Sequence, residues 1–435
     1  MFDYLIIGAG PGGLGLAHRL NEQGNKVAIV ENDKWGGTCP NYGCDPTKMM
    51  MALVEAKSRV ERLQGHGING DVAIDWAGMR ARKTEITDLY EPQAHAVLES
   101  AGVKTIYGTA TFTESGEVRV NGTNYQAKKI IIATGTRSRS LDIEGVEFLS
   151  TSNDFLALEQ IPERITFLGI GPISLELAQL AHAVGAQVKV IAVHDLTINH
   201  FDETIGTAFL KQLQAEGIEF KANFSVSKIE KIANGLRLSD EKGFEWETDM
   251  VIAGVGRVPN IEQLNLNAVS VETNRDGILV NEFLQTSNDK IYAMGDVLAK
   301  PIGHLTPVSS FENRYLAQTL NQENPQAIRY PVIPSVIYGA VKLAEIGKLQ
   351  GENLTTKIVD MTSWYTYRRI NDPISQIKIA ANAEGELVGA SIISSVADEL
   401  VNFIMILIER KITLSEFDKM IPAYPTIASD LSYLY

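Results

Sequence analysis

Apolar runs separated by glycine turns mark the first part of the chain as an alternation of strands and helices. The run at residues 3–8, Asp-Tyr-Leu-Ile-Ile-Gly, predicts a strand that is buried on both faces, as in a parallel sheet. A helical segment at 14–23 and a second strand at 26–30 follow it, and residues 130–135 predict another buried strand that ends in a turn. Strands that alternate with helices in this way are typical of an α/β fold.

The pattern repeats in the middle of the chain and changes near its end. Residues 52–100 are rich in Ala, Glu, Lys, Arg and Leu, which favours helix. A strand that begins at residue 165 and a helix after it start a second alternation, and from residue 330 the apolar runs predict strands followed by helices. These last segments are strands at 333–337, 376–380 and 387–393 and helices at 397–410 and 414–420.

Composition sets the size and the class of the protein. A chain of 435 residues is long enough for about three domains, and 45% hydrophobic residues with 36 glycines fit a well-buried α/β protein. The net charge of -14 argues against a surface that binds nucleic acid. The most apolar stretch, 404–408, is far shorter than the ~20 residues of a membrane span, and no basic region precedes the first strand. We therefore expect a cytoplasmic protein with no membrane or nucleic-acid partner.

A glycine motif links the first strand to the helix that follows it. Gly8, Gly10 and Gly13 have the spacing of a dinucleotide-binding fingerprint, and Glu31 ends the second strand. In this fingerprint the first glycine makes a tight turn, the second lets the backbone approach a pyrophosphate, and the third allows close packing of helix on strand. Glu31 can then accept a hydrogen bond from a ribose hydroxyl. Strand, turn, helix, strand and acid together predict a dinucleotide site.

A second, imperfect fingerprint follows the strand that begins at residue 165. Gly169 and Gly171 match its first two glycines, and Ser174, which is small enough to fit, stands where the third is expected. Two such motifs after two strands predict two separate dinucleotide sites.

The residue that selects between NAD and NADP is expected at the end of the next strand, 187–192. A carboxylate there favours NAD, and basic residues just beyond it favour NADP. Ala192 supplies no carboxylate and His194 matches the NADP pattern, so the sequence leans slightly towards NADPH. An exposed loop histidine with no role in binding is the alternative interpretation of His194.

The only two cysteines of the chain, Cys39 and Cys44, lie close together in sequence. A crosslink over so short a loop stabilises a fold little, and a metal site would need further Cys or His ligands nearby. We therefore interpret the pair as a redox-active dithiol or disulfide. Pro40 and Gly43 suit the bend that would bring the two Cα atoms within bonding range. Pro46 can begin a helix with Cys44 at its N-terminus, where the helix dipole favours a thiolate.

The segment from Gly36 to Lys48 resembles the active-site helix of the class I pyridine nucleotide–disulfide oxidoreductases, a family that includes glutathione reductase, dihydrolipoamide dehydrogenase and mercuric reductase. The resemblance implies that Cys39 is the interchange thiol that meets the substrate and that Cys44 stacks against a flavin. Asp45 departs from the family, which has an apolar residue at this position. Pro172, after the second glycine of the second motif, stands where the family often has a tyrosine that shields the flavin.

The resemblance spans nearly the whole chain and implies FAD and NADPH or NADH as cofactors. It implies two Rossmann-like dinucleotide-binding domains and a C-terminal α+β dimerisation domain, and therefore a homodimer. The expected domains are FAD-binding at 1–149 and 261–329, NAD(P)-binding at 150–260 and dimerisation at 330–435. Further cofactor-binding residues expected from the family's motifs are Thr38, Ala110, Thr134, Gly135, Gly256 and Asp296.

Two more positions carry expectations about catalysis. Lys48 and Glu176 match positions where the family has an ion pair beside the flavin, so the resemblance predicts that pair here. Near the C-terminus the family has a histidine and a glutamate that act as acid and base for the interchange thiol. Tyr424 replaces that histidine and Ser429 replaces the glutamate. Tyrosine is a poor base at pH 7 because its pKa lies near 10, so we expect slow disulfide reduction.

The predicted activity is that of an oxidoreductase, which passes a hydride from NAD(P)H through FAD and the Cys39–Cys44 disulfide to an external acceptor. We expect a disulfide-containing substrate that is reduced slowly because the dyad is missing. A metal ion, a quinone or oxygen is the alternative acceptor, since none of them needs a thiol to be protonated by histidine. A non-catalytic flavin redox sensor is the alternative from another functional class. We expect no resident metal ion.

Overall fold

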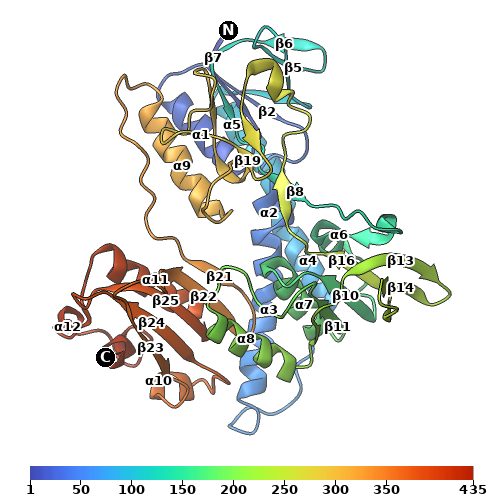
Figure 1. Cartoon of the computed structure of the whole chain (residues 1–435), viewed down its shortest axis with the longest axis vertical. Coiled ribbons are helices and arrows are strands. Elements are labelled where there is room, and N and C mark those ends of the chain that lie inside the picture. The colour runs from blue at the N-terminus through green and yellow to red at the C-terminus, as the bar shows by residue number, and fades with distance from the viewer. Residues whose placement is uncertain (435) are drawn as a thin grey trace. The chain divides into compact units, whose positions relative to one another are not determined.

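A computed structural model describes residues 1–434, and the chain folds into two compact units (Figure 1). The first unit consists of Met1–Pro46, Arg82–Arg139 and Gly256–Arg329. The second unit consists of Thr47–Ala81, Ser140–Val255 and Tyr330–Tyr435. Each unit is therefore assembled from three stretches that are far apart in the sequence.

The first unit is built on a five-stranded parallel sheet with helices packed beside it. Its main elements are β1 (Phe2–Ile7), α1 (Pro11–Glu22), β2 (Val27–Glu31), α5 (Tyr90–Ser100), β3 (Lys104–Tyr107), β7 (Ala127–Ile132), β20 (Ile291–Ala293) and α9 (Thr306–Thr319). The strand order is β20-β7-β1-β2-β3, and α1 packs against both α9 and α5. β1 is central because its residues from Tyr4 to Ile7 are apolar and buried. The parallel register brings the carboxyl ends of all five strands to one edge of the sheet.

Short elements complete the first unit. They are the antiparallel sheet β4 (Thr111–Phe112), β5 (Val118–Val120) and β6 (Thr123–Tyr125), the pair β8 (Thr136–Ser138) and β17 (Arg257–Pro259), the hairpin β18 (Thr273–Asn274) and β19 (Gly277–Ile278), and the helices α2 (Thr38–Tyr42), η2 (Leu266–Val269) and η3 (Gly295–Val297). A long helix, α3 (Cys44–Arg62), begins in this unit and continues in the second.

The second unit contains another five-stranded parallel sheet, in the order β12-β11-β10-β16-β9. The elements of this sheet and the helices nearby are α4 (Trp76–Thr87), η1 (Val146–Phe148), β9 (Leu149–Ser150), α6 (Ser152–Ala157), β10 (Arg164–Leu168), α7 (Pro172–Ala183), β11 (Gln187–Ile191), α8 (Glu203–Ala215), β12 (Glu219–Lys221) and β16 (Met250–Ala253). α7 packs on β10 and β11 through a nearly continuous buried face from Ser174 to Ala181.

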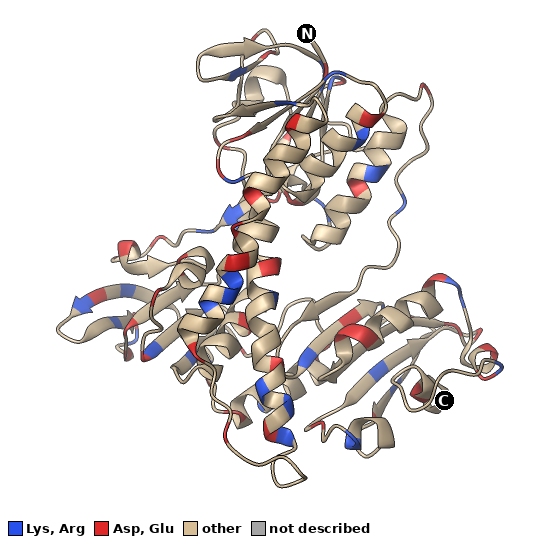
Figure 2. Ribbon diagram, turned by 180° about the vertical axis from the view of Figure 1, so that it is seen from behind, with Lys and Arg blue, Asp and Glu red and all other residues tan. Residues whose placement is uncertain are grey.

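An antiparallel meander interrupts this second strand–helix alternation. It consists of β13 (Val226–Ile232), β14 (Gly235–Asp240) and β15 (Glu245–Thr248). Figure 2 shows charged residues of both signs along these strands. Two ion pairs lie on them, Lys228–Glu230 and Arg237–Glu247. Alternating charge on the outer face leaves the inward residues Ile229 and Leu238 to pack in the core.

The C-terminal part of the second unit is an antiparallel sheet covered by helices. Its elements are β21 (Ser335–Ile337), β22 (Lys342–Gly347), β23 (Thr355–Asp360), α10 (Tyr365–Arg368), β24 (Gln376–Ala381), β25 (Leu387–Ser394), α11 (Ala397–Glu409), α12 (Leu414–Phe417) and η4 (Ser429–Tyr433). The strand order is β21-β22-β25-β24-β23. α11 packs on β25 and β22 through buried Leu400, Val401 and Ile404, while Phe403 and Ile406 on its other face are exposed.

The mixed α/β fold with parallel sheets agrees with the prediction, and the differences have local causes. Residues 52–100 do not form continuous helix, because Gly65, Gly67 and Gly70 lie between α3 and α4 with positive φ, a conformation that ends a helix. β23 was not predicted because most of its side chains are exposed and leave no apolar pattern. The helix expected at 414–420 ends at Phe417.

Candidate active site

The first glycine turn brings β1 and α1 so close together that only glycine fits. Gly8 has a φ of +106°, and a Cβ there would lie 2.4 Å from the carbonyl oxygen of Ala133. A Cβ on Gly13 would lie 2.0 Å from the carbonyl oxygen of Gly8, which is the close helix–strand packing expected of the third glycine. Gly10 directly precedes α1. Because the first N–H groups of a helix have no partners within it, this turn suits a phosphate.

Gly37, which the fingerprint does not include, approaches the same turn. Its φ is +67°, and a Cβ on it would lie 2.6 Å from the Cα atom of Gly10. Gly36 donates its N–H to the carbonyl oxygen of Ala9 at 3.0 Å. The start of the cysteine segment is therefore held against the glycine turn by backbone contacts, with Thr38 exposed just beyond them. The Gly-Gly pair was the signal available in the sequence.

Glu31 lies at the end of β2 and is buried, with an exposed fraction of 9%. Its carboxylate accepts hydrogen bonds from the backbone N–H groups of Ala9 at 2.7 Å and of Asn32 and Asp33 at 2.9 Å each. Burial raises the pKa of Glu31, and the three N–H donors oppose that shift. A carboxylate has about four lone-pair positions, so one remains for a ribose hydroxyl. Glu31 thus also braces the glycine turn that Ala9 belongs to.

Other predicted cofactor-binding residues lie at the same sheet edge. Thr134 and Gly135 follow β7, Asp296 follows β20, and Ala110 lies beyond β3. The Thr134 hydroxyl is buried and has no hydrogen-bond partner among the described residues. Such a group is costly to bury, and a ligand that bonds to it removes the cost. The glycine cradle, Glu31 and this hydroxyl together fit FAD.

Glu312, which was not predicted, supports the turn that carries Asp296. Its side chain is fully buried, and it accepts the N–H of Gly295 at 2.6 Å and forms an ion pair with buried Lys300. A buried carboxylate of this kind is tolerated only when it is paired. The signal was present in the sequence, because Glu312 lies one helical turn from Val308 and from Leu316 on the apolar face of α9.

The two cysteines lie on either side of a break between two helices. Cys39 is in α2 and half-buried, whereas Cys44 begins α3 and is exposed, and Gly43 separates the helices. The two cysteines are not joined by a disulfide bond, and the sulfur of Cys44 lies 3.7 Å from the hydroxyl oxygen of Thr306. A hydrogen bond to Cys44, and then burial, raise the pKa of the Cys39 thiol. Cys44 lies at the N-terminus of α3, a position where the helix dipole favours a thiolate.

The second glycine turn uses a different arrangement of small residues. A Cβ on Gly169, whose φ is +95°, would lie 2.4 Å from the carbonyl oxygen of Gly254. Ser174 is fully buried at the third position of the motif, and a Cβ on Gly254 would lie 1.9 Å from its hydroxyl oxygen. Ser174 therefore fits because the facing residue, Gly254, has no side chain. Gly171 directly precedes α7, as Gly10 precedes α1.

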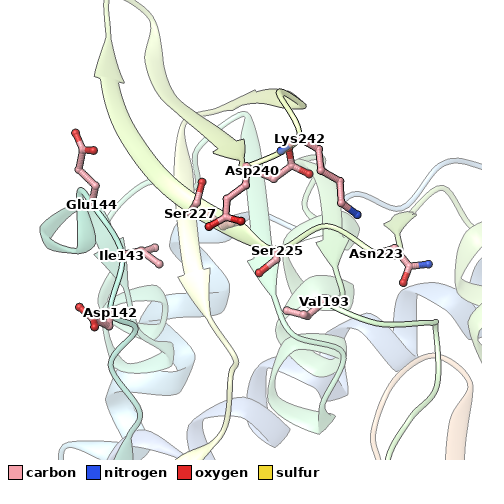
Figure 3. Close-up of a pocket in the computed structure, with 11 residues that line it drawn as sticks. Asp142, Ile143, Glu144, Val193, Asn223, Ser225, Ser227, Asp240 and Lys242 are labelled. Atoms are coloured by element: carbon pink, nitrogen blue, oxygen red, sulfur yellow. The ribbon is translucent and has the colours of Figure 1, made fainter.

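A hollow of about 610 Å³ opens beside the end of β11, where the residue that selects the cofactor was expected (Figure 3). Ile143 and Val193 point into it from opposite sides, and Ser225 lies between them (Figure 3). The charged residues that line it are Asp142, Glu144, Asp240, Glu241 and Lys242. Glu144 forms an ion pair with Lys228 at 3.0 Å, so three other acids against Lys242 leave the lining negative.

His194 lies on the exposed loop after β11, outside the residues that line the hollow. Its carbonyl oxygen accepts the N–H of Asn223 at 3.2 Å, and the Asn223 side chain donates to Asp195 at 3.1 Å. These bonds hold the backbone of the loop, and the His194 side chain is exposed on it.

Gly256, another predicted cofactor-binding residue, lies in the first unit. It has a φ of +101°, and its carbonyl oxygen accepts the N–H of Arg139 at 3.1 Å.

The predicted ion pair between Lys48 and Glu176 is present in the second unit. The Lys48 ammonium lies 2.5 Å from one Glu176 oxygen, and the other oxygen accepts the N–H of Tyr338 at 3.0 Å. The ammonium also lies 4.7 Å from the centre of the Tyr338 ring. Glu176 is buried, so Lys48 and the N–H supply the partners that a buried carboxylate needs.

Tyr424 has a side chain with an exposed fraction of 67%, and it stacks on Tyr365 with 6.2 Å between ring centres. Ser429 donates its hydroxyl to the carbonyl oxygen of Thr426 at 2.6 Å, within its own turn. Asp430 is buried, and burial raises its pKa. Among the described residues, neither Ser429 nor Asp430 supplies Tyr424 with the carboxylate partner that the family's histidine has.

Two features are absent from residues 1–434. No helix there combines the length and the apolar character that crossing a membrane requires. No three or more His, Cys, Asp or Glu side chains in that range gather as a metal site.

Comparison with known proteins gives matches over nearly the whole chain. Residues 2–319 match the family described as pyridine nucleotide-disulphide oxidoreductase, and residues 333–434 match the dimerisation domain of that family. A mercuric reductase of Staphylococcus aureus is 29% identical over 99% of this chain and 81% of its own length. A glutathione reductase of Yarrowia lipolytica is 29% identical over 99% and 98%, and dihydrolipoyl dehydrogenase 2 of Haloarcula marismortui is 28% identical over 98% and 94%.

Solved structures with the same fold include the HOCl-induced flavoprotein disulfide reductase RclA of Escherichia coli. It superposes with a TM-score of 0.90 at 23% identity, over 100% of this chain and 99% of its own. A Cu(II) complex of the same reductase superposes with a TM-score of 0.89 at 22% identity, over 99% and 98%. At this identity the likeness concerns the fold alone.

Proposed function

Because this chain belongs to the pyridine nucleotide-disulphide oxidoreductase family, whose members use FAD and NAD(P)H, we propose that it reduces an external acceptor through Cys39 and Cys44. The observation that carries the proposal is the placement of the chain's only two thiols. They lie on either side of one helix break, and a hydrogen bond to Cys44 raises the pKa of Cys39 above that of an ordinary thiol. FAD, when bound, supplies the carrier that accepts a hydride from the nicotinamide and returns the electron pair to the disulfide.

The two thiols divide the reaction with a disulfide acceptor. Cys39, as thiolate, attacks one acceptor sulfur, the acceptor S–S bond breaks, and the first half leaves and takes a proton. Cys44 then attacks the Cys39 sulfur, which releases the second half and closes the Cys39–Cys44 bond. Two electrons pass from the two enzyme thiols to the acceptor, which ends as two thiols.

We propose that Tyr424 leaves this exchange without a histidine-like acid and base. Its phenol holds its proton near pH 7, and general acid–base help typically contributes about 10²–10⁴-fold, so disulfide reduction is slow. The pH profile of turnover then lacks a step near 6.5 and rises towards alkaline pH, because the raised pKa of Cys39 delays formation of its thiolate.

A metal cation is the second candidate acceptor. Two relatives point to it, since one carries the name mercuric reductase and the solved RclA structures include a Cu(II) complex. Reduction of a metal ion needs no protonation of a leaving thiol, so the loss of the histidine has little effect on it. We propose that such a cation is a substrate and not a resident metal.

For the nicotinamide we propose NADH, against the slight lean of the sequence towards NADPH. The support is the acidic lining of the hollow beside β11, where Lys228 pairs with Glu144 and three further carboxylates oppose Lys242. The extra phosphate of NADPH carries nearly two negative charges and meets repulsion there. His194 on the neighbouring loop lies outside the hollow and offsets little of it.

We also propose that the working form is a homodimer. The dimerisation domain covers residues 333–434, and exposed apolar side chains lie within it. They are Phe403, Ile406, Met420, Ile421 and Tyr424. A partner subunit that covers these side chains would remove them from water.

The decisive experiment mixes the holoenzyme with NADH or NADPH in a stopped-flow instrument and then offers disulfides, Cu(II), Hg(II), quinones and oxygen in turn. We expect fast flavin reduction, two new titratable thiols per chain, and faster turnover with a metal ion than with glutathione disulfide. Slow flavin reduction by both nicotinamides would favour a redox sensor. Glutathione disulfide turnover that is fast and unchanged in Tyr424→Phe would contradict the role given to the missing dyad.

A further inference from the structure

Asp45 places a full negative charge beside the reactive dithiol. It follows Cys44 in the first turn of α3, at a position where the family has an apolar residue. The side chain is half-buried, so water screens its charge only in part. The charge acts on Cys39, where it adds to the effect of Cys44 in raising the pKa of the thiol.

Tyr90 lies beside this carboxylate. Tyr90 begins α5, a helix that packs against α2, which carries Cys39. The negative charge of Asp45 acts on the Tyr90 hydroxyl and raises its pKa, so the two side chains lie near each other. Tyr90 also lies close enough to Cys39 to interact with it electrostatically. Cys39, Asp45 and Tyr90 are therefore one cluster drawn from three helices.

The other charges around α2 do not cancel Asp45. Asp33 accepts a hydrogen bond from Tyr42 on α2 at 3.2 Å, and Glu91 on α5 acts on the same Tyr42. Lys34 lies 5.3 Å from the centre of the Tyr42 ring and offsets one of these two acids. The N-terminus of α3 contributes about half a positive charge, which is less than the full charge of Asp45. Among the side chains named here, three acids (Asp45, Asp33 and Glu91) stand against one base, Lys34.

We propose that Asp45, positioned by Tyr90, makes the dithiol selective for the charge of its acceptor, favouring cationic and neutral acceptors over anionic disulfides. The proposal rests on the function proposed above and narrows its substrate class. Glutathione disulfide is an anion near neutral pH, whereas cystamine and metal ions are cations. Near a protein surface, one unit charge at close range changes an encounter by about threefold for each unit of acceptor charge.

The first test measures thiol reactivity and does not depend on turnover. In holoenzyme carrying Cys44→Ser, Cys39 is the single thiol, and it is treated with a cationic and an anionic methanethiosulfonate of similar size. The Cys39 thiolate attacks the sulfenyl sulfur, a new S–S bond forms, and a sulfinate leaves, while the thiol proton goes to solvent. Mass spectrometry of quenched samples gives the ratio of cationic to anionic rates, relative to a small neutral thiol.

We expect this ratio to be high with Asp45 present and to fall by about tenfold in Asp45→Asn, because the reagents differ by two unit charges. Tyr90→Phe should lower it by a smaller factor, since the carboxylate stays but is no longer held. Glu114→Gln, which removes an exposed acid from the turn between β4 and β5, is the matched control and should leave the ratio unchanged. An unchanged ratio in Asp45→Asn would overturn the proposal.

A salt titration needs no substitution at Asp45. Raising the ionic strength from about 0.01 M to about 0.5 M shortens the Debye length from about 30 Å to a few ångströms. The ratio for Cys39 should fall towards that of the free thiol over this range. A ratio that does not respond to salt would overturn the proposal even if Asp45→Asn failed to fold.

Turnover of the holoenzyme then connects the selectivity with the proposed function. Asp45→Asn should raise kcat/KM for glutathione disulfide relative to cystamine by about 80-fold, because the two disulfides differ by four unit charges. If the nicotinamides fail to reduce the flavin, the proposed function is wrong, yet the reagent ratio still decides the role of Asp45. If turnover proceeds and the preference between the two disulfides is the same in both proteins, the charge selectivity is wrong and the proposed function remains.

Discussion

The two glycine turns of this chain follow the same sequence motif but obtain their close packing from different residues. In the first turn the small residue is on the helix, because a Cβ on Gly13 would lie 2.0 Å from the carbonyl oxygen of Gly8. In the second turn the helix carries Ser174, and the space comes from Gly254 at the end of the neighbouring strand. The motif therefore requires that little side-chain volume lies between helix and strand, and the glycine that ensures this can belong to either one.

The ends of the second strands differ as well. Glu31 ends β2 as a buried carboxylate that three backbone N–H groups stabilise, so its position is fixed. The corresponding place after β11 has Ala192 and then exposed Val193, and the charge lies instead on the rim of a hollow. In the first unit the acid is part of the dinucleotide-binding motif itself, whereas in the second unit the acids lie on loops and on the meander β13–β15.

The largest expected effect follows from closing the first turn. Gly13→Ala places a methyl group against backbone that cannot move aside, so we expect loss of most bound FAD and a lower Tm. The flavin content of the purified protein and thermal unfolding measure both. Gly206→Ala in α8 is the control, because nothing lies within 4 Å of a Cβ there. Normal flavin content in Gly13→Ala would show that the turn is more tolerant than its geometry indicates.

The next effect concerns the acid that braces the first turn. Glu31→Gln keeps the shape but removes the charge and turns an NH₂ group towards N–H donors, which costs about 2–3 kcal/mol. We expect weaker FAD binding by tenfold or more, seen as faster flavin release on dilution. Glu323→Gln changes an exposed acid of the same unit and should have no effect. Equal FAD affinity in Glu31→Gln and the parent would contradict the bracing role.

A smaller effect tests whether Ser174 and Gly254 share one space in the second turn. Gly254→Ala drives a methyl group into the Ser174 hydroxyl and should destabilise the protein by about 1–2 kcal/mol, as overpacking does. Ser174→Gly alone should change stability little. The double variant should recover part of the loss, measured by urea unfolding as a double-mutant cycle. Strictly additive effects would mean that the two residues do not share one space.

The smallest effect concerns the choice of nicotinamide. Val193→Arg adds a cation that points into the acidic hollow and should raise kcat/KM for NADPH relative to NADH by about tenfold. Val193→Leu keeps an apolar side chain there and serves as the control. A parent enzyme that already prefers NADPH would contradict the argument from the acidic rim.

The sequence predicted the site correctly where all the residues that shape it lie in one short segment. Gly8, Gly13 and Glu31 lie within a single strand–helix–strand stretch, so their spacing alone predicted the turn and its acid. Gly37 and Gly254 could not be assigned in this way, because each matters only through a residue from another segment. The acids of the hollow come from two stretches far from the strand end, so the slight lean towards NADPH rested on the strand end alone.

The same limit applies near the dithiol. The break at Gly43 follows from residue types that interrupt a helix, and the sequence anticipated it. The electrostatic interaction between Tyr90 and Asp45 links two helices whose approach depends on how α5 packs on α2. Apolar periodicity predicts that such helices exist, but it does not fix which polar side chains meet at their ends.

The contact between Ser174 and Gly254 restricts the order in which substitutions could accumulate. A protein with glycine at position 174 tolerates any small residue at 254, but once serine occupies 174, every residue larger than glycine at 254 meets its hydroxyl. The two positions should therefore vary together among descendants of this chain. A lineage that acquired serine first would have passed through a strained intermediate, whereas one that acquired glycine at 254 first would not.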